Sequence, residues 1–279
     1  MAFLHPARVV DWGEMQNSRI RLVAAAVCCF LGSPVSCAFG QASPDSQIVE
    51  DARTVYYNLR DQGLREFRCD VRVDWSAGLV AQHGDAAGSG ELWPLLRQTH
   101  FEAVLGTMGA PRVSLRFDGA APSDETAARL RAASAGVERS LNGVLQELSS
   151  VLFGSLLPPD RDYHLENQGD HFRITFGSDE VRIVETMNRD HALEEMIVAT
   201  QKSTVSVRPQ FQRGEKGFLP VVIDSSVEAA GADKVELHVE IAYQTVEGFH
   251  LPQTVGVRDQ ELGGGAPVQF RFSDYQMTR

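Results

Sequence analysis

From about residue 161 to its end, the chain alternates apolar and polar side chains over short segments separated by turn-forming residues. Successive side chains of a β-strand point to opposite faces, so this alternation predicts strands with one buried and one hydrated face. The clearest run covers residues 234–243, and no helical segment interrupts the series. Further runs lie at residues 171–176, 181–183, 205–211, 219–227, 251–257 and 268–272, with another strand around Ile197. Turns at 213–217, 230–233, 247–248 and 263–265 make this an antiparallel meander.

Two helices are expected before the meander. Residues 46–62 keep helical spacing, with Gly63 as the stop, and residues 122–153 form the longest periodic stretch, ended by Pro158 and Pro159. At 1.5 Å per residue the second helix would be about 45 Å long.

The segment between these helices contains two predicted strands. Residues 67–75 and 112–117 alternate apolar and polar side chains. Residues 78–90 are polar and glycine-rich and indicate a loop. Residues 91–107 stay ambiguous, because Pro94 interrupts a helix unless it lies in the first turn.

These elements define one α+β domain over residues 43–279. About ten strands must bury their apolar faces against the helices or the curvature of the sheet itself. We therefore expect a curved antiparallel meander that forms an open or half barrel, covered by one or two long helices. The open question is whether the leucines of the long helix fill the hollow or only cover it; they are Leu141, Leu145, Leu148 and Leu152.

Residues 1–42 have the order of a secretory signal peptide. Arg19 and Arg21 precede an apolar run at 22–32, which is too short to span a membrane, and small residues follow. Acidic residues near the start make Met15 a plausible true start. A lipid anchor at Cys37 is the alternative, which Pro34 disfavours. The protein is thus expected to be exported, periplasmic or secreted, with no transmembrane span in the mature chain.

The charge and the cysteines limit the possible functions further. The formal net charge of −11 argues against a nucleic-acid partner, because phosphate contacts need clustered lysine and arginine. Of the four cysteines, only Cys69 lies beyond the expected signal peptide, so no internal disulfide is expected. Cys69 falls on the apolar side of its strand and is predicted to be a buried small hydrophobe.

No catalytic or metal-binding constellation stands out, and no cofactor is indicated. The histidines lack the spacing of a zinc site. An aspartic-protease-like segment at 219–226 contains Asp224. Asp118 could be its partner only by stretching the sequence pattern, and Ser226 stands where that pattern has glycine. A polar strand end is the favoured interpretation of Asp224, and a hydrolase is a distant alternative.

Two segments near the C-terminus carry a family resemblance: Gly217-Phe218-Leu219-Pro220 and, more strongly, residues 241–252 (IAYQTVEGFHLP). With the order of elements, they resemble the bacterial lipoprotein-carrier superfamily, the LolA/LolB-like unclosed barrels. The resemblance implies a periplasmic protein whose concave apolar face accommodates acyl chains beneath a lid of helices. It transfers no individual ligand-contacting residue, and turn chemistry alone also accounts for both segments.

The leading hypothesis is therefore an exported, non-enzymatic protein that binds a lipid or acyl chain. The alternative is an envelope scaffold or interaction protein with a filled interior and a protein partner. The candidate wall of the apolar site consists of Phe67, Val71, Trp75, Leu115, Phe117, Val239, Ile241, Tyr243, Phe270 and Phe272.

Overall fold

The structure, a computed structural model, describes residues 44–75, 89–120, 122–159, 161–259 and 268–279. The expected signal peptide, Cys37, most of the predicted loop at 78–90 and the turn at 263–265 lie outside the described residues.

The described chain forms one antiparallel sheet of twelve strands in the order β3-β2-β1-β12-β11-β10-β9-β8-β7-β6-β5-β4. The sheet is not closed, since β3 and β4 are its two edges. The first strands are β1 (Glu66–Val73), β2 (Thr99–Gly106), β3 (Arg112–Phe117), β4 (His164–Asn167), β5 (His171–Gly177) and β6 (Val181–Asn188). The others are β7 (Leu193–Thr200), β8 (Ser203–Gly214), β9 (Gly217–Ala229), β10 (Val235–Val246), β11 (Phe249–Asp259) and β12 (Val268–Thr278). The predicted α+β meander is thus confirmed as a large open antiparallel sheet with helices.

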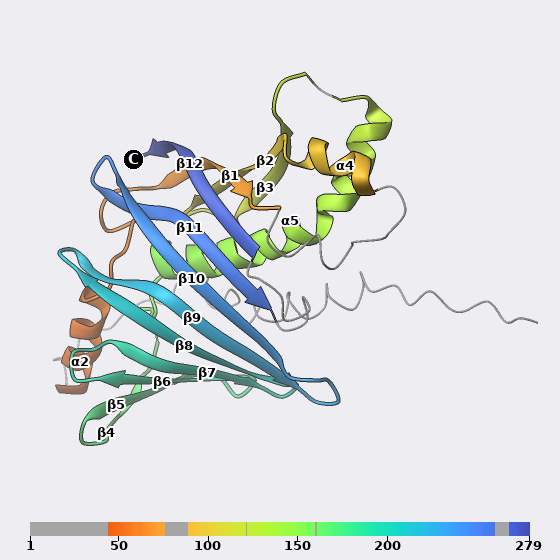
Figure 1. Cartoon of the computed structure of the whole chain (residues 1–279). Helices are drawn as coiled ribbons and strands as arrows, with labels where there is room; N and C mark the ends of the chain where they lie inside the picture. Colours follow the sequence, from red (N-terminus) through yellow and green to blue (C-terminus); the bar gives the residue numbers. More distant parts are fainter. Residues whose placement is uncertain (1–43, 76–88, 121, 160, 260–267) are drawn as a thin grey trace, which may run out of the picture.

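The N-terminal strands join the meander through the pairing of β1 with β12, in which Glu66 lies opposite Thr278 and Val73 opposite Phe270. The sequence pattern gave no sign of this pairing. Its consequence is that the elements on both sides of the long helix share one sheet (Figure 1).

The long helix α5 (Asp124–Phe153) has 30 residues and confirms the predicted helix. Its N-cap is Ser123, whose side chain accepts a hydrogen bond from the backbone N–H of Thr126, and Asp124 and Glu125 stand in the first turn. It ends at Gly154, four residues before the prolines expected to stop it.

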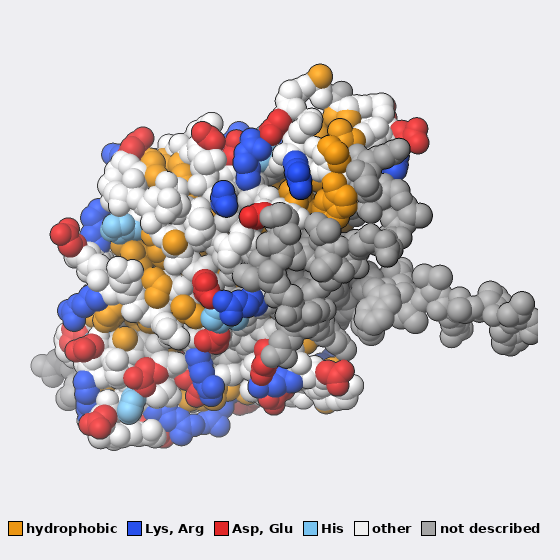
Figure 2. Space-filling view, viewed as in Figure 1, with side chains coloured by type: hydrophobic (Ala, Val, Ile, Leu, Met, Phe, Trp, Pro, Cys, Tyr) orange, Lys and Arg blue, Asp and Glu red, His pale blue; other side chains and the backbone are white. Residues whose placement is uncertain are grey.

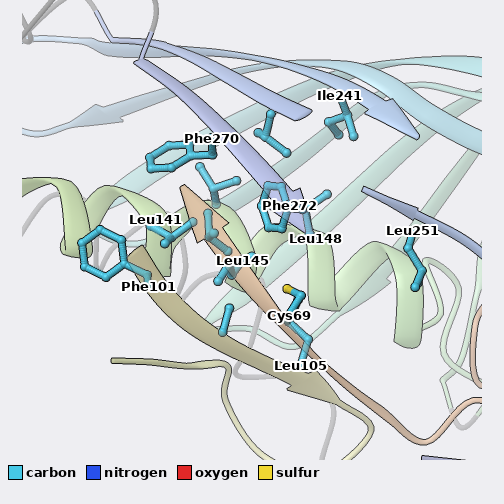
Figure 3. Close-up of a cluster of buried hydrophobic side chains, with 14 of the residues drawn as sticks. Cys69, Phe101, Leu105, Leu141, Leu145, Leu148, Ile241, Leu251, Phe270 and Phe272 are labelled. Atoms are coloured by element: carbon cyan, nitrogen blue, oxygen red, sulfur yellow. The ribbon is translucent and has the colours of Figure 1, made fainter. Parts of the chain in front are cut away.

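The leucines of α5 point at the sheet. Leu141, Leu145 and Leu148 pack among side chains of β1, β2, β10, β11 and β12 (Figure 3), and none is more than 1% exposed. Cys69 lies in the same cluster, fully buried and free, as the alternation of its strand predicts. Burial raises the pKa of its thiol, which makes it a poor nucleophile.

One expected helix end was wrong, one segment left open is now assigned, and one strand was missed. Helix α2 (Pro44–Thr54) ends eight residues before the predicted helix end at residue 62, because residues 55–57 leave the helix to bond with β9. The ambiguous segment splits into α4 (Ser89–Leu96), which contains Pro94, and strand β2. Strand β4 was not foreseen.

None of the helices in the described part of the chain combines the length and the apolar character needed to cross a bilayer.

Replacing Leu145 with alanine is expected to lower the free energy of unfolding by about 2–5 kcal/mol, since Leu145 is fully buried and its removal leaves a cavity. Urea unfolding followed by circular dichroism measures this. Met108→Ala is the control, because Met108 is 89% exposed and should change stability by at most ~0.5 kcal/mol. Equal effects of the two substitutions would contradict the packing of α5 described above.

Gly217→Ala is expected to destabilise the protein by about 3 kcal/mol or more. Gly217 has a φ of +121°, and an added Cβ would lie 2.7 Å from the Val55 carbonyl oxygen and 2.8 Å from the Tyr57 nitrogen. The matched control is Gly231→Ala, at a φ of +74° with open space around the Cβ, for which ~1 kcal/mol is expected. If the two variants unfold at the same urea concentration, residues 55–57 do not pack against β9 as closely as described.

Candidate functional site

Two separate core clusters cover one face of the sheet, which we call the inner face. The first joins α5 to β1, β2, β9, β10, β11 and β12. The second joins α2 and the segment after α5 to β5, β6, β7, β8 and β9, with Val49, Ala52 and Leu157 as its helix and loop members. Val207 of β8 packs against both clusters, so the junction between them runs along β8 and β9.

All the residues predicted as the apolar wall come together in the first cluster. Those that are buried there are Phe67, Val71, Trp75, Val239, Ile241, Phe270 and Phe272. Those that are partly buried and pack against it are Leu115, Phe117 and Tyr243. The leucines of α5 lie against this wall, so the protein's own helix occupies this part of the inner face (Figure 3).

The two segments that carry the family resemblance hold the chain after α2. The Tyr57 N–H donates to the Phe218 carbonyl oxygen at 3.0 Å, and the Phe218 N–H donates to the Val55 carbonyl oxygen at 2.7 Å. The hydroxyl of Tyr57 accepts from the His250 N–H at 2.8 Å. The glycine-phenylalanine restarts of β9 and β11 therefore position the end of α2 over the sheet.

A carboxyl group lies in the middle of the second cluster. Glu185 of β6 is 0% exposed, and neither of its carboxyl oxygens has a hydrogen-bond partner among the described residues. On the same face its neighbours along the strand are Ile183 and Met187, both buried. Burial raises its pKa from 4.5 to about 8, so at neutral pH most of this group is protonated.

The polar groups nearest to Glu185 already have partners. The hydroxyl of Tyr56 donates to the His191 carbonyl oxygen at 2.7 Å and accepts from the Leu193 N–H at 2.9 Å. The hydroxyl of Tyr163 donates to the Pro158 carbonyl oxygen. Burial, with a further contribution from the charge of Glu185, raises the pKa of Tyr56.

Ser225 shares a transverse row of the sheet with Glu185. Glu185 pairs with Met196, Met196 with Val207, and Val207 with Ser225. Ser225 is 6% exposed, and its hydroxyl oxygen also lacks a partner in the described part of the chain. The row thus has a buried polar group at each end and two partly exposed apolar side chains, Met196 and Val207, between them.

Two further buried polar atoms have no partner among the described residues, Nε1 of Trp75 and Oε2 of Glu147 on α5. Glu147 does not share the row, and burial raises its pKa to about 7.

The hydrolase alternative finds no support in the geometry. Asp224 lies on the outer face, with Oδ1 2.6 Å from Nδ1 of His238, whose Nε2 lies 3.0 Å from Glu240. These hydrogen bonds raise the pKa of His238. Asp118 follows β3 and pairs with Arg72 and His100. Five strands separate β3 from β9 in the sheet, so the two aspartates cannot share a proton.

The charged side chains instead form groups on the outer face. Figure 2 shows acidic, basic and histidine side chains interspersed on the side of the molecule it presents. Within the described residues, no three His, Cys, Asp or Glu side chains come together as a metal site. This arrangement is that of a solvated surface rather than of a reaction centre.

Sequence reasoning missed Glu185, although a signal was available. Val181, Ile183 and Met187 alternate along β6, and Glu185 occupies a position of this apolar series. A charged residue in the register of buried ones is unusual, because burial of a charge costs several kcal/mol. Ser225 gave no comparable signal, since serine is common on either face of a strand.

Comparison with known proteins finds no matching family, no similar curated protein and no similar solved structure.

Glu185→Gln is expected to flatten the pH dependence of stability. The folded protein binds this proton more tightly than the unfolded chain, so the contribution of Glu185 is complete below pH 4.5 and is lost as the pH rises toward about 8. The free energy of unfolding of the wild type should therefore fall relative to that of the variant by up to about 1.4 kcal/mol per pH unit over this range. Urea unfolding at several pH values measures the difference. A difference that does not change with pH would show that Glu185 is not buried as described.

Proposed function

We propose that this chain is an exported, non-enzymatic protein that binds a lipid or acyl chain on the inner face of a half-barrel sheet, with α2 and α5 as the lid. The observation that carries the proposal is the junction between the two core clusters. There the apolar inner face continues from strand to strand, and Met196, Val207 and Leu237 are only partly buried. Partly exposed apolar side chains in one row are typical of a surface that takes an apolar ligand.

Three further points support it. The signal-like order of residues 1–42 favours export, and the lipoprotein-carrier resemblance favours an acyl ligand. Helices α2 and α5 contribute to different core clusters, so the cover over the inner face is divided between two elements.

The second candidate is an envelope scaffold or interaction protein with a filled interior. Its support is the burial of the α5 leucines, which are 0–1% exposed against the first part of the inner face. A scaffold of this kind would use its outer face to bind a partner and would bind no lipid.

Protein purified from a bacterial envelope is expected to release a lipid on organic extraction, detected by mass spectrometry, and to bind a fluorescent fatty acid. Val207→Asn should weaken binding of the fluorescent probe at least tenfold, because it puts an amide on the apolar junction. Thr204→Asn is the matched control, since Thr204 lies on the same strand but is exposed.

The two candidates give opposite results. Absence of both extracted lipid and probe binding in the wild type would exclude the lipid-binding function and favour the scaffold. Equal loss of binding in the two variants would place the ligand elsewhere than on the inner face.

A further inference from the structure

Glu185 and Ser225, the two polar ends of the row that also contains Met196 and Val207, have no side-chain hydrogen bond to any of the described residues. Buried polar groups are nearly always hydrogen-bonded, so an isolated one calls for a specific explanation. Here there are two, on the same face and in the same transverse row, at 0% and 6% exposure.

Within the part of the chain that the structure describes, no side chain supplies the missing donor to Glu185. The hydroxyls of Tyr56 and Tyr163 donate to backbone carbonyl oxygens. The guanidinium of Arg53, which lies 5.6 Å from the ring centroid of Tyr163, donates to the carbonyl oxygens of Leu157 and Pro158 and pairs with Glu50. The two phenols whose pKa values Glu185 affects, and the guanidinium beside Tyr163, are thus engaged with other groups.

The spacing of the row defines the length of a ligand that would reach both ends. Three inter-strand steps separate β6 from β9, and each step is about 4.8 Å, which places Glu185 and Ser225 roughly 14 Å apart. Met196 and Val207 lie between them and offer only apolar contact. A straight chain of about ten carbons spans this distance.

We propose that this row binds an unbranched amphiphile whose protonated amine pairs with the Glu185 carboxylate, whose chain lies over Met196 and Val207, and whose far polar end bonds the hydroxyl of Ser225. The proposal rests on the lipid-binding function above and specifies its ligand class. An ammonium group supplies both the charge and the donors that a buried carboxylate needs, and charge-assisted hydrogen bonds are the strongest available. Because Glu185 is covered in this structure, the ligand gains access when the second cluster opens under α2.

Binding of the amine is coupled to the release of a proton from Glu185. The carboxylic acid of Glu185 loses its proton to the buffer as the ammonium arrives, so that a carboxylate and an ammonium form one ion pair and one proton is released per ligand. A neutral alcohol of the same length binds without this release. The hydroxyls of Tyr56 and Tyr163 stay protonated at pH 7, because burial raises the pKa of both, with a further contribution from the charge of Glu185.

Isothermal titration calorimetry at pH 7, in two buffers of different ionisation enthalpy, tests the proposal on the full chain with decylamine, decanol and decanoate. Decylamine is expected to bind at least tenfold more tightly than decanol and to release up to one proton. Glu185→Gln should abolish both the tighter binding of decylamine relative to decanol and the proton release, while decanol still binds. Glu194→Gln, which removes a charge from the exposed side of β7, should change neither.

Binding at the Ser225 end of the row is tested by a second ligand. Aminodecanol, with its amine and hydroxyl at opposite ends, should bind several-fold more tightly than decylamine to the wild type. Ser225→Ala should remove this gain and leave the proton release intact. Circular dichroism of each variant confirms that it is folded, and the proton release of the wild type stands as a test even if a variant does not fold.

The outcomes separate this proposal from the one on which it rests. If decanol binds but decylamine binds no better and releases no proton, the amine site is wrong and the lipid-binding function survives. If decanoate binds more tightly than decylamine, the amine site is also wrong. If none of the probes binds, the lipid-binding function itself is wrong.

Discussion

A sheet of twelve strands presents more apolar surface than one helix of 30 residues can cover. Every strand with an alternating pattern has one face that must leave water, and the free energy of burial scales with the area removed from it. The chain meets this requirement with two covers, α5 over the β1 side and α2 with the segment after α5 over the β5 side. The boundary between the covers falls along β8 and β9, where Val207 packs against both clusters.

Polar groups placed inside an apolar cluster lower stability unless something pairs with them. Glu185 inside the second cluster and Ser225 at the boundary carry this penalty, whereas on the outer face His238 pairs with Asp224 and Arg258 with Glu240. The division of roles between the faces is therefore sharp. The outer face carries exposed ion pairs, each of which contributes little to stability. The inner face carries Glu185 and Ser225, whose side chains have no hydrogen-bond partner among the described residues.

Local patterns predicted the elements whose structure depends on local physics. The leucine periodicity from Leu130 to Leu152 located α5, and strict alternation located β5, β8, β9, β10, β11 and β12 together with β1 and β3. The elements that the local patterns placed wrongly or missed have a common cause, which is contact between residues far apart in the sequence. Helix α2 stops early because Tyr57 pairs with Phe218, and β2 was obscured because Pro94 and the leucines around it resemble a broken helix. The residues predicted as the wall lie together in the first cluster under α5, whereas the sequence analysis did not single out Glu185 among the polar residues of its strand.

The pairing of β1 with β12 also governs when the molecule can be completed. Glu66 and Thr278 are neighbours in the sheet, so β1 has no partner on that side until β12 has been synthesised. Contacts so distant in sequence slow folding, because a large loop must close before they form. A chain built in this way keeps the β1 side of its sheet incomplete until β12 has emerged from the ribosome.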